Sequence, residues 1–158
     1  TRRGVAVSDE AIRSGLEQAQ IPGRFQVLQP NKAGATLVLD GAHNEDGVQT
    51  LVQSLEAEWP GKRFTFVVGT SKNHNPEPVL RLLCPITRRV VATAPAFRPT
   101  PAADTASVAQ ELGLAVTVCE PAGHAIAQAY EQAEAGEVVV VTGSLYTVGE
   151  TPPQLREG

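Results

Sequence analysis

The stretch Val138-Val139-Val140-Val141 decides the fold class of this chain of 158 residues. A strand that is apolar at every position is typical of a parallel sheet covered by helices on both faces. Two more apolar runs of strand length occur at Thr36–Leu39 and Phe64–Val68. Between these two runs, apolar residues recur at helical spacing over 48–59. This alternation of strand and helix predicts a layered α/β fold.

The same patterns extend outward from this centre. Further strands are expected at 25–28, 89–93 and 115–118, and further helices from Ser8 to a stop at Pro22-Gly23, over 76–83, over 102–112, and from Pro121 to Gly136. From residue 36 onward strands and helices alternate, so these five strands are expected to run parallel with right-handed connections.

The first strand is expected to differ, because the link from residue 28 to residue 36 is too short for a crossover. It should pair antiparallel at an edge of the sheet. The predicted fold is therefore an α/β, Rossmann-like three-layer sandwich with five parallel strands, one antiparallel edge strand and helices on both faces. It would occupy residues 1–150 as one domain, followed by a polar tail at 151–158.

Composition excludes several classes of protein. A hydrophobic fraction of 42% and a charged fraction of 19% argue against a disordered chain or a coiled coil. The net charge of −4, without clustered Lys or Arg, argues against a nucleic-acid partner. The longest apolar run is far shorter than the roughly 20 residues that span a membrane, and residues 1–20 lack a signal-peptide core.

Two cysteines without a CxxC pair argue against a disulfide framework and favour a cytoplasmic location. The first residue is Thr1 and the sequence contains no Met, which we interpret as a sign of a fragment.

Ligands of such a sheet bind beyond the carboxyl ends of its strands, which selects the loops at 40–44, 69–75, 94–98, 120–123 and 143–146. The loops at 40–44, 69–75 and 143–146 are the candidates for chemistry because of their polar and glycine residues. The start of a helix after such a loop can hold an anion through backbone N–H groups. His43 can donate to a carboxylate or phosphate, and Lys72 and a protonated His74 can face an anion. The plainer interpretation, left open, is that Asp40 closes a turn and Asn44 caps a helix.

Several sharper motifs are missing from the sequence. There is no GxGxxG fingerprint, no phosphate-binding GxxxxGK[ST] loop and no GxSxG elbow. The HxE at 43–45 lacks the PCxxC partner of zinc deaminases. A metal site formed by the three histidines is not expected, because nothing in their spacing brings them together.

Three segments resemble the C-terminal domain of the folylpolyglutamate synthase and dihydrofolate synthase family, within the Mur ligase superfamily. They are DGAHN at 40–44, IPGR at 21–24, which resembles the family's WPGR, and VTGSLYTVGE at 141–150, which resembles VTGSLYLVGE. Their order and spacing match the family across nearly the whole chain. Each segment alone is weak, and the combination is specific.

The resemblance implies an ATP-dependent ligase that forms an amide bond. A folate γ-carboxylate is phosphorylated and the resulting acyl phosphate is attacked by the amine of glutamate. The family's phosphate-binding loop and magnesium ligands lie in an N-terminal domain outside this sequence. This chain would close over ATP and substrates held by that partner domain, and would be inactive alone.

The resemblance also implies site residues, position by position. ATP contacts are expected from Arg24, Asp40 and His43, and substrate binding or domain closure from Asn44, Lys72, Ser144 and Tyr146. No catalytic residue and no metal ligand is expected in the isolated domain. One departure is clear: Lys72-Asn73-His74-Asn75 stands where the family usually reads KDKD, which puts any closure contact of that loop in doubt.

Two other interpretations stay open: a stand-alone α/β ligand-binding module, and the equivalent domain of a Mur ligase that acts on a peptidoglycan precursor. The sequence does not distinguish addition of the first glutamate to dihydropteroate from extension of a polyglutamate tail.

Overall fold

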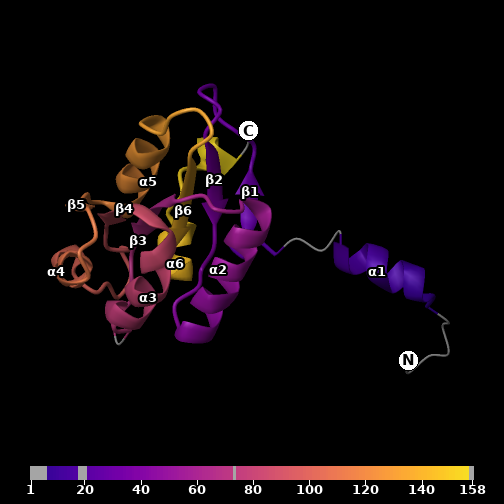
Figure 1. Cartoon of the computed structure of the whole chain (residues 1–158), viewed down its shortest axis with the longest axis horizontal. Coiled ribbons are helices and arrows are strands. Elements are labelled where there is room, and N and C mark those ends of the chain that lie inside the picture. Colours follow the sequence, from indigo (N-terminus) through magenta and orange to yellow (C-terminus); the bar gives the residue numbers. More distant parts are fainter. Residues whose placement is uncertain (1–6, 18–20, 73, 157–158) are drawn as a thin grey trace.

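The fold is built on one mixed sheet of six strands (Figure 1). A computed structural model of the chain describes residues 7–17, 21–72 and 74–156. The strand order is β1-β2-β6-β3-β4-β5. The strands are β1 (Gln26–Leu28), β2 (Thr36–Leu39), β3 (Phe64–Val68), β4 (Thr87–Ala92), β5 (Val116–Val118) and β6 (Val138–Thr142).

Strand β1 pairs antiparallel with β2, and every other neighbouring pair is parallel. Strand β6 lies between β2 and β3, with Val140 opposite both Val38 and Phe66. All five residues of β6 are buried, which explains why the sequence there contains no polar residue before Thr142. The predicted arrangement of five parallel strands and one antiparallel edge strand is confirmed.

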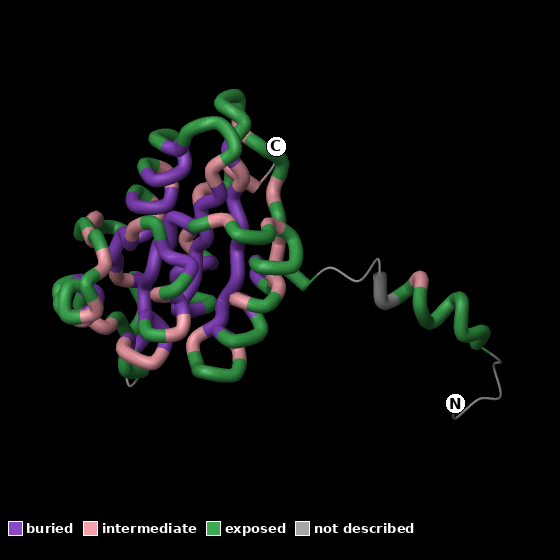
Figure 2. Tube along the Cα trace, in the orientation of Figure 1, coloured by how far each residue is buried: buried purple, intermediate pink, exposed green. Residues whose placement is uncertain are grey.

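Helices cover both faces of the sheet, and two separate clusters of buried residues mark the two faces. The buried residues gather around the central strands (Figure 2). On one face lie α2 (Glu45–Glu58), α3 (Pro76–Leu83) and α4 (Ala102–Glu111), which pack over Phe66 and Val140. On the other lie α5 (Ala122–Glu131), α6 (Leu145–Gly149) and α7 (Pro153–Arg156), which pack over Val139 and Val141.

Helix boundaries follow local chemistry. The Asn44 side chain accepts a hydrogen bond from Gly47 N and begins α2, and the Asn75 side chain does the same for α3 through Glu77 N. Near the N-terminus, Ser8 Oγ accepts from Ala11 N and caps α1 (Asp9–Glu17). The predicted continuation of this helix through Ala19 lies outside the described residues. No helix in the described part of the chain has both the length and the apolar content needed to cross a membrane.

Besides α6, which begins where a loop was expected at 143–146, three details differ from the sequence expectation. Strand β4 starts at Thr87, after the short 3-10 turn η1 (Cys84–Ile86), and Pro121 is the N-cap of α5 and not a residue of its first turn. The third concerns the polar tail expected at 151–158. Its residues Pro153–Arg156 form α7, and the Arg156 guanidinium donates to the carbonyls of Val148 and Thr151.

Candidate ligand-binding site at the carboxyl edge of the sheet

The topology creates a crevice between the loops that follow β3 and β6. The chain leaves β2 and β3 through helices on one face of the sheet and enters β6 from α5 on the other face. Such a reversal of winding is where ligands of open α/β sheets bind. The crevice lies beside the ends of β2, β6 and β3, which carry the three loops singled out in the sequence.

Glycines allow these loops to approach one another closely. Gly143 has a φ of 95°, and a Cβ atom there would lie 2.8 Å from the carbonyl oxygen of Gly69. A Cβ atom at Gly41 would lie 2.3 Å from Leu145 Cδ2. A side chain at either position would therefore separate loops that the site requires to be in contact.

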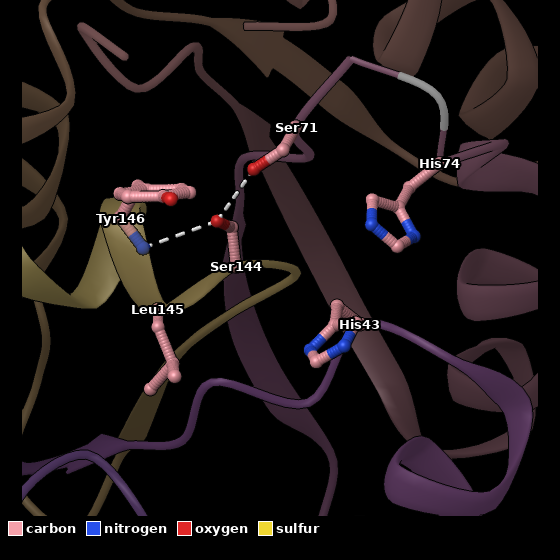
Figure 3. Close-up of a pocket in the computed structure, with 6 residues that line it drawn as sticks. All are labelled: His43, Ser71, His74, Ser144, Leu145 and Tyr146. Atoms are coloured by element: carbon pink, nitrogen blue, oxygen red, sulfur yellow. Dashed lines mark hydrogen bonds between the residues drawn. The ribbon is translucent and has the colours of Figure 1, made fainter. Parts of the chain in front are cut away.

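Two serine hydroxyls meet at the bottom of the crevice, one from each loop (Figure 3). Ser71 Oγ and Ser144 Oγ form a hydrogen bond of 2.8 Å, although 73 residues separate them in the sequence. Ser144 is buried and is also the N-cap of α6, where its Oγ accepts from Tyr146 N. The two side chains are thus held in place before any ligand arrives.

Two imidazole rings form the opposite wall. The His43 and His74 ring centroids lie 5.2 Å apart in an edge-to-face arrangement. His43 Nδ1 lies 2.9 Å from the carbonyl oxygen of Gly41, so it donates its proton there. The neutral ring then carries its lone pair on Nε2.

Together these loops enclose a hollow of about 280 Å³, lined by His43, Ser71, His74, Ser144, Leu145 and Tyr146. The Tyr146 ring stands on the side away from the histidines (Figure 3) and packs against Phe97, with ring centroids 4.8 Å apart. About half of each of these two aromatic side chains is exposed.

Lys72 and Asn44 lie in neighbouring hollows. Lys72 lines an open depression of about 620 Å³ together with His74, Asn75 and Asp104. Asn44 lines a third, smaller one with His43 and His74, and its side-chain oxygen is occupied by capping α2. Asn44 is therefore the helix cap that the plainer interpretation anticipated.

Asp40 is placed behind the rim. Its side chain is buried, and its two oxygens accept hydrogen bonds from Phe25 N (2.7 Å) and Ala42 N (2.8 Å). Phe25 has a φ of 42°, a conformation that is unusual for a bulky residue. Asp40 thus fixes the turn that carries Arg24.

Arg24 itself is exposed on that turn, and no hydrogen bond or ion pair of its side chain occurs among the described residues. The preceding residue, Gly23, packs against Leu145 and Val148. Arg24 therefore lies on the same rim as the hollow without lining it.

Of the seven residues expected from the resemblance, the structure brings His43, Ser144 and Tyr146 into one hollow. Lys72 and Asn44 belong to the same loops but line neighbouring hollows, and Arg24 lies on a turn that Asp40 holds through Phe25 N. The site residues expected from the resemblance did not include Ser71, His74 and Leu145, which also line the hollow. The sequence signal that could have identified Ser71 and His74 was their position in a loop after a predicted parallel strand.

Metal ligands do not gather here. Within the described ranges, no group of three or more His, Cys, Asp or Glu side chains is placed to hold a metal ion. We therefore assign no metal ligand to these residues.

The fold and the position of the hollow define a Rossmann-like α/β domain with a hollow at its topological switch point. The model of the family described as "Mur ligase, glutamate ligase domain" matches residues 23–145. The chain belongs to this family, which confirms the resemblance found in the sequence.

Two proteins similar to this chain are consistent with the family assignment. The dihydrofolate synthase/folylpolyglutamate synthase of Bacillus subtilis is 28% identical over 95% of this chain and 34% of the relative. The bifunctional folylpolyglutamate synthase/dihydrofolate synthase of Yersinia pestis, solved with AMPPNP and a manganese ion, superimposes with a TM-score of 0.76 at 31% identity. The superposition covers 92% of this chain and 34% of the Yersinia chain. The chain spans about a third of the length of these relatives.

A cell-wall relative matches less of the chain. The UDP-N-acetylmuramoyl-L-alanyl-D-glutamate–L-lysine ligase of Streptococcus pneumoniae is 35% identical over 46% of this chain and 14% of the relative.

Proposed function

We propose that this chain is the C-terminal domain of an ATP-dependent ligase that joins glutamate to the carboxyl group of a folate-type acid. The observation that carries the proposal is coverage: 95% of the chain aligns with one third of a dihydrofolate synthase/folylpolyglutamate synthase. The nucleotide analogue and manganese ion in the Yersinia structure support the use of ATP and a divalent metal by the whole enzyme. The partners would be the N-terminal domain, ATP, the folate-type acid and glutamate.

In the proposed reaction the γ-phosphoryl group of ATP passes to the acid, giving an acyl phosphate and ADP. The glutamate amine then attacks the acyl carbon, and phosphate leaves as the amide forms. As the resemblance implies, magnesium would be held by the N-terminal domain.

Different residues around the hollow would bind different parts of the reactants. The Arg24 guanidinium, exposed and unpaired within the described part of the chain, is suited to bind nucleotide phosphates. Asp40 would support nucleotide binding by holding the turn of Arg24 through Phe25 N. The Ser71 and Ser144 hydroxyls and the two imidazoles would face substrate oxygens in the hollow.

The proposal is tested in the reading frame upstream of Thr1. A glycine-rich GK[ST] loop there supports a ligase, and an immediate start codon supports a stand-alone module. The longer protein is then assayed for ADP release that depends on both glutamate and dihydropteroate or tetrahydrofolate. Ser144→Ala should raise the KM for glutamate, while Ser54→Ala on α2, outside the hollow, should not.

The 158 residues alone should form no ADP under the same conditions. An acyl phosphate exposed to water hydrolyses, so a domain without its partner lacks the closed cavity that the reaction needs. Measurable folate-dependent ADP formation by this chain would contradict the proposed division between two domains.

A peptidoglycan-precursor ligase is the second candidate, because the pneumococcal relative matches 46% of the chain. The same assay separates the two. ADP release with a UDP-muramoyl peptide and an amino acid, and none with a folate, would favour the second candidate.

A further inference from the structure

The N-terminal helix α1 (Asp9–Glu17) stands apart from the sheet and the helices that cover it (Figure 1). None of the α1 side chains that the structure describes is buried (Figure 2). Within the described part of the chain, neither of the two clusters of buried residues includes a residue of α1. The core around the sheet is therefore built without this helix.

A helix as short as α1 needs a surface to pack against. It has nine residues, whereas isolated helices below about 12–15 residues are marginal in water. The Ser8 cap favours the helix, but Gly15 in its interior has an opposite effect of similar size. The surface that stabilises α1 must therefore come from outside the sheet domain described above.

The apolar side of α1 is centred on Ile12, whose side chain is 49% exposed. Val7, just before the helix, is 51% exposed. Position 16, a leucine, follows Ile12 by one turn and so falls on the same side of the helix. Glu10 is two residues from Ile12 and falls on the opposite side. The helix thus has an apolar side without a packing partner and a charged side.

We infer that α1 is a docking helix whose apolar side binds the domain that precedes this chain in a longer protein. The identity of that domain rests on the proposed function, whereas the need for a packing surface rests on α1 itself. The family model begins at residue 23, so α1 lies before the matched domain. About two thirds of the Bacillus relative's length is not covered by this chain, which is ample for a domain.

The small size of α1 favours a surface in the same polypeptide over a second copy. The helix is about 14 Å long, and one side of it covers far less than the roughly 800 Å² per partner of a stable interface between separate proteins. A tethered partner is present at an effective concentration of about millimolar, so a small contact is enough. Three acids and one base in α1 also argue against binding to an anionic membrane.

Trypsin cleavage after Arg13 tests this inference. The Arg13 side chain is exposed, and a helix without a packing surface opens readily, so the 158-residue chain should be cut there quickly. In the longer protein, docking should slow this cleavage by at least about ten-fold, because cleavage follows the population of the open form. The fragments are identified by mass spectrometry.

Two substitutions to the same residue separate the sides of the helix. Ile12→Gln should return cleavage of the longer protein to within about two-fold of the rate in the 158-residue chain. The matched control Glu10→Gln, on the opposite side, should keep the protection. Both variants are also made in the 158-residue chain, which corrects for changes in the intrinsic rate of cleavage.

Equal cleavage after Arg13 in the two wild-type proteins, or protection that survives Ile12→Gln, overturns the inference. Protection of the 158-residue chain that grows with its concentration would assign the helix to a second copy instead. Ligation is measured on the same samples. A longer protein that ligates glutamate without protecting Arg13 refutes the docking and leaves the ligase proposal standing, and one that protects Arg13 without ligating does the reverse.

Discussion

Replacing Asp40 by Asn separates a structural role of this carboxylate from direct ligand binding. The carboxylate accepts from two backbone N–H groups at 2.7 and 2.8 Å in a buried position. An amide has one oxygen and one NH₂ group, so in either orientation one backbone N–H would face another donor. Asp40→Asn therefore loses one charge-assisted hydrogen bond and leaves one buried donor unsatisfied.

The expected cost follows from these contacts. A hydrogen bond to a charged group contributes about 1.5–3 kcal/mol, and an unsatisfied buried donor costs about 1–3 kcal/mol. Because the two effects overlap, we expect the free energy of unfolding to fall by about 2–4 kcal/mol. For a domain of this size, that lowers Tm by about 5–15 °C.

Urea denaturation measures the effect through Trp59, the one tryptophan in the sequence, whose ring lies 6.5 Å from that of Phe25. The matched control is Asp46→Asn, an exposed carboxylate in the first turn of α2, for which we expect a loss of at most about 1 kcal/mol. A stability of Asp40→Asn within about 0.5 kcal/mol of wild type would refute the reasoning. It would show that the carboxylate does not hold the Phe25 turn and is free to bind a ligand directly.

Three further changes test other contacts. Gly143→Ala should lower the free energy of unfolding by about 1–3 kcal/mol in denaturant titrations, because the new Cβ atom would lie 2.8 Å from the carbonyl oxygen of Gly69. The control Gly149→Ala, where the space around the new Cβ atom is open, should change the free energy of unfolding by less than about 1 kcal/mol. Burial raises the pKa of the Tyr130 phenol above 10, so the folded state holds this proton more tightly than the unfolded state. The free energy of unfolding therefore falls as pH rises past 10. Tyr130→Phe should reduce this fall between about pH 9 and 11. Arg156→Ala removes two guanidinium–carbonyl hydrogen bonds, and carboxypeptidase should then trim the C-terminus faster than in the wild type.

The sheet was predictable because its signals are local. An all-valine strand such as Val138–Val141 indicates burial on both faces, and the short link before Thr36 leaves an antiparallel pairing as the available connection. Helix α6 was not predicted because it has five residues, too few to show a helical repeat. Its cap, Ser144, follows a glycine and was interpreted as part of a loop.

The loops that form the site could be predicted from the sequence, but the contacts between their side chains could not. The rule that ligands bind beyond the carboxyl ends of strands selected five loops, and three of them line the hollow. The Ser71–Ser144 hydrogen bond joins the loops after β3 and β6. These strands become neighbours because β6 inserts between β2 and β3, and no local pattern encodes that insertion. Asp40 was assigned to nucleotide contact by position, and the hydrogen bond from Phe25 N was not foreseen because Phe25 lies 15 residues away in the sequence.

Hydrogen bonds connect the loops around the hollow to one another. Thr147 Oγ1 donates to the carbonyl of Gly69, and Gly143 N donates to the carbonyl of Ala42, so three loops share one set of buried hydrogen bonds. Moving one loop would break contacts with the other two. If the chain is the ligase domain proposed here, closure over the acyl phosphate must therefore occur by movement of the whole domain as a rigid body. The cleft would then close at a hinge outside the hollow, with Ser144, Ser71 and His43 arriving together in their final geometry.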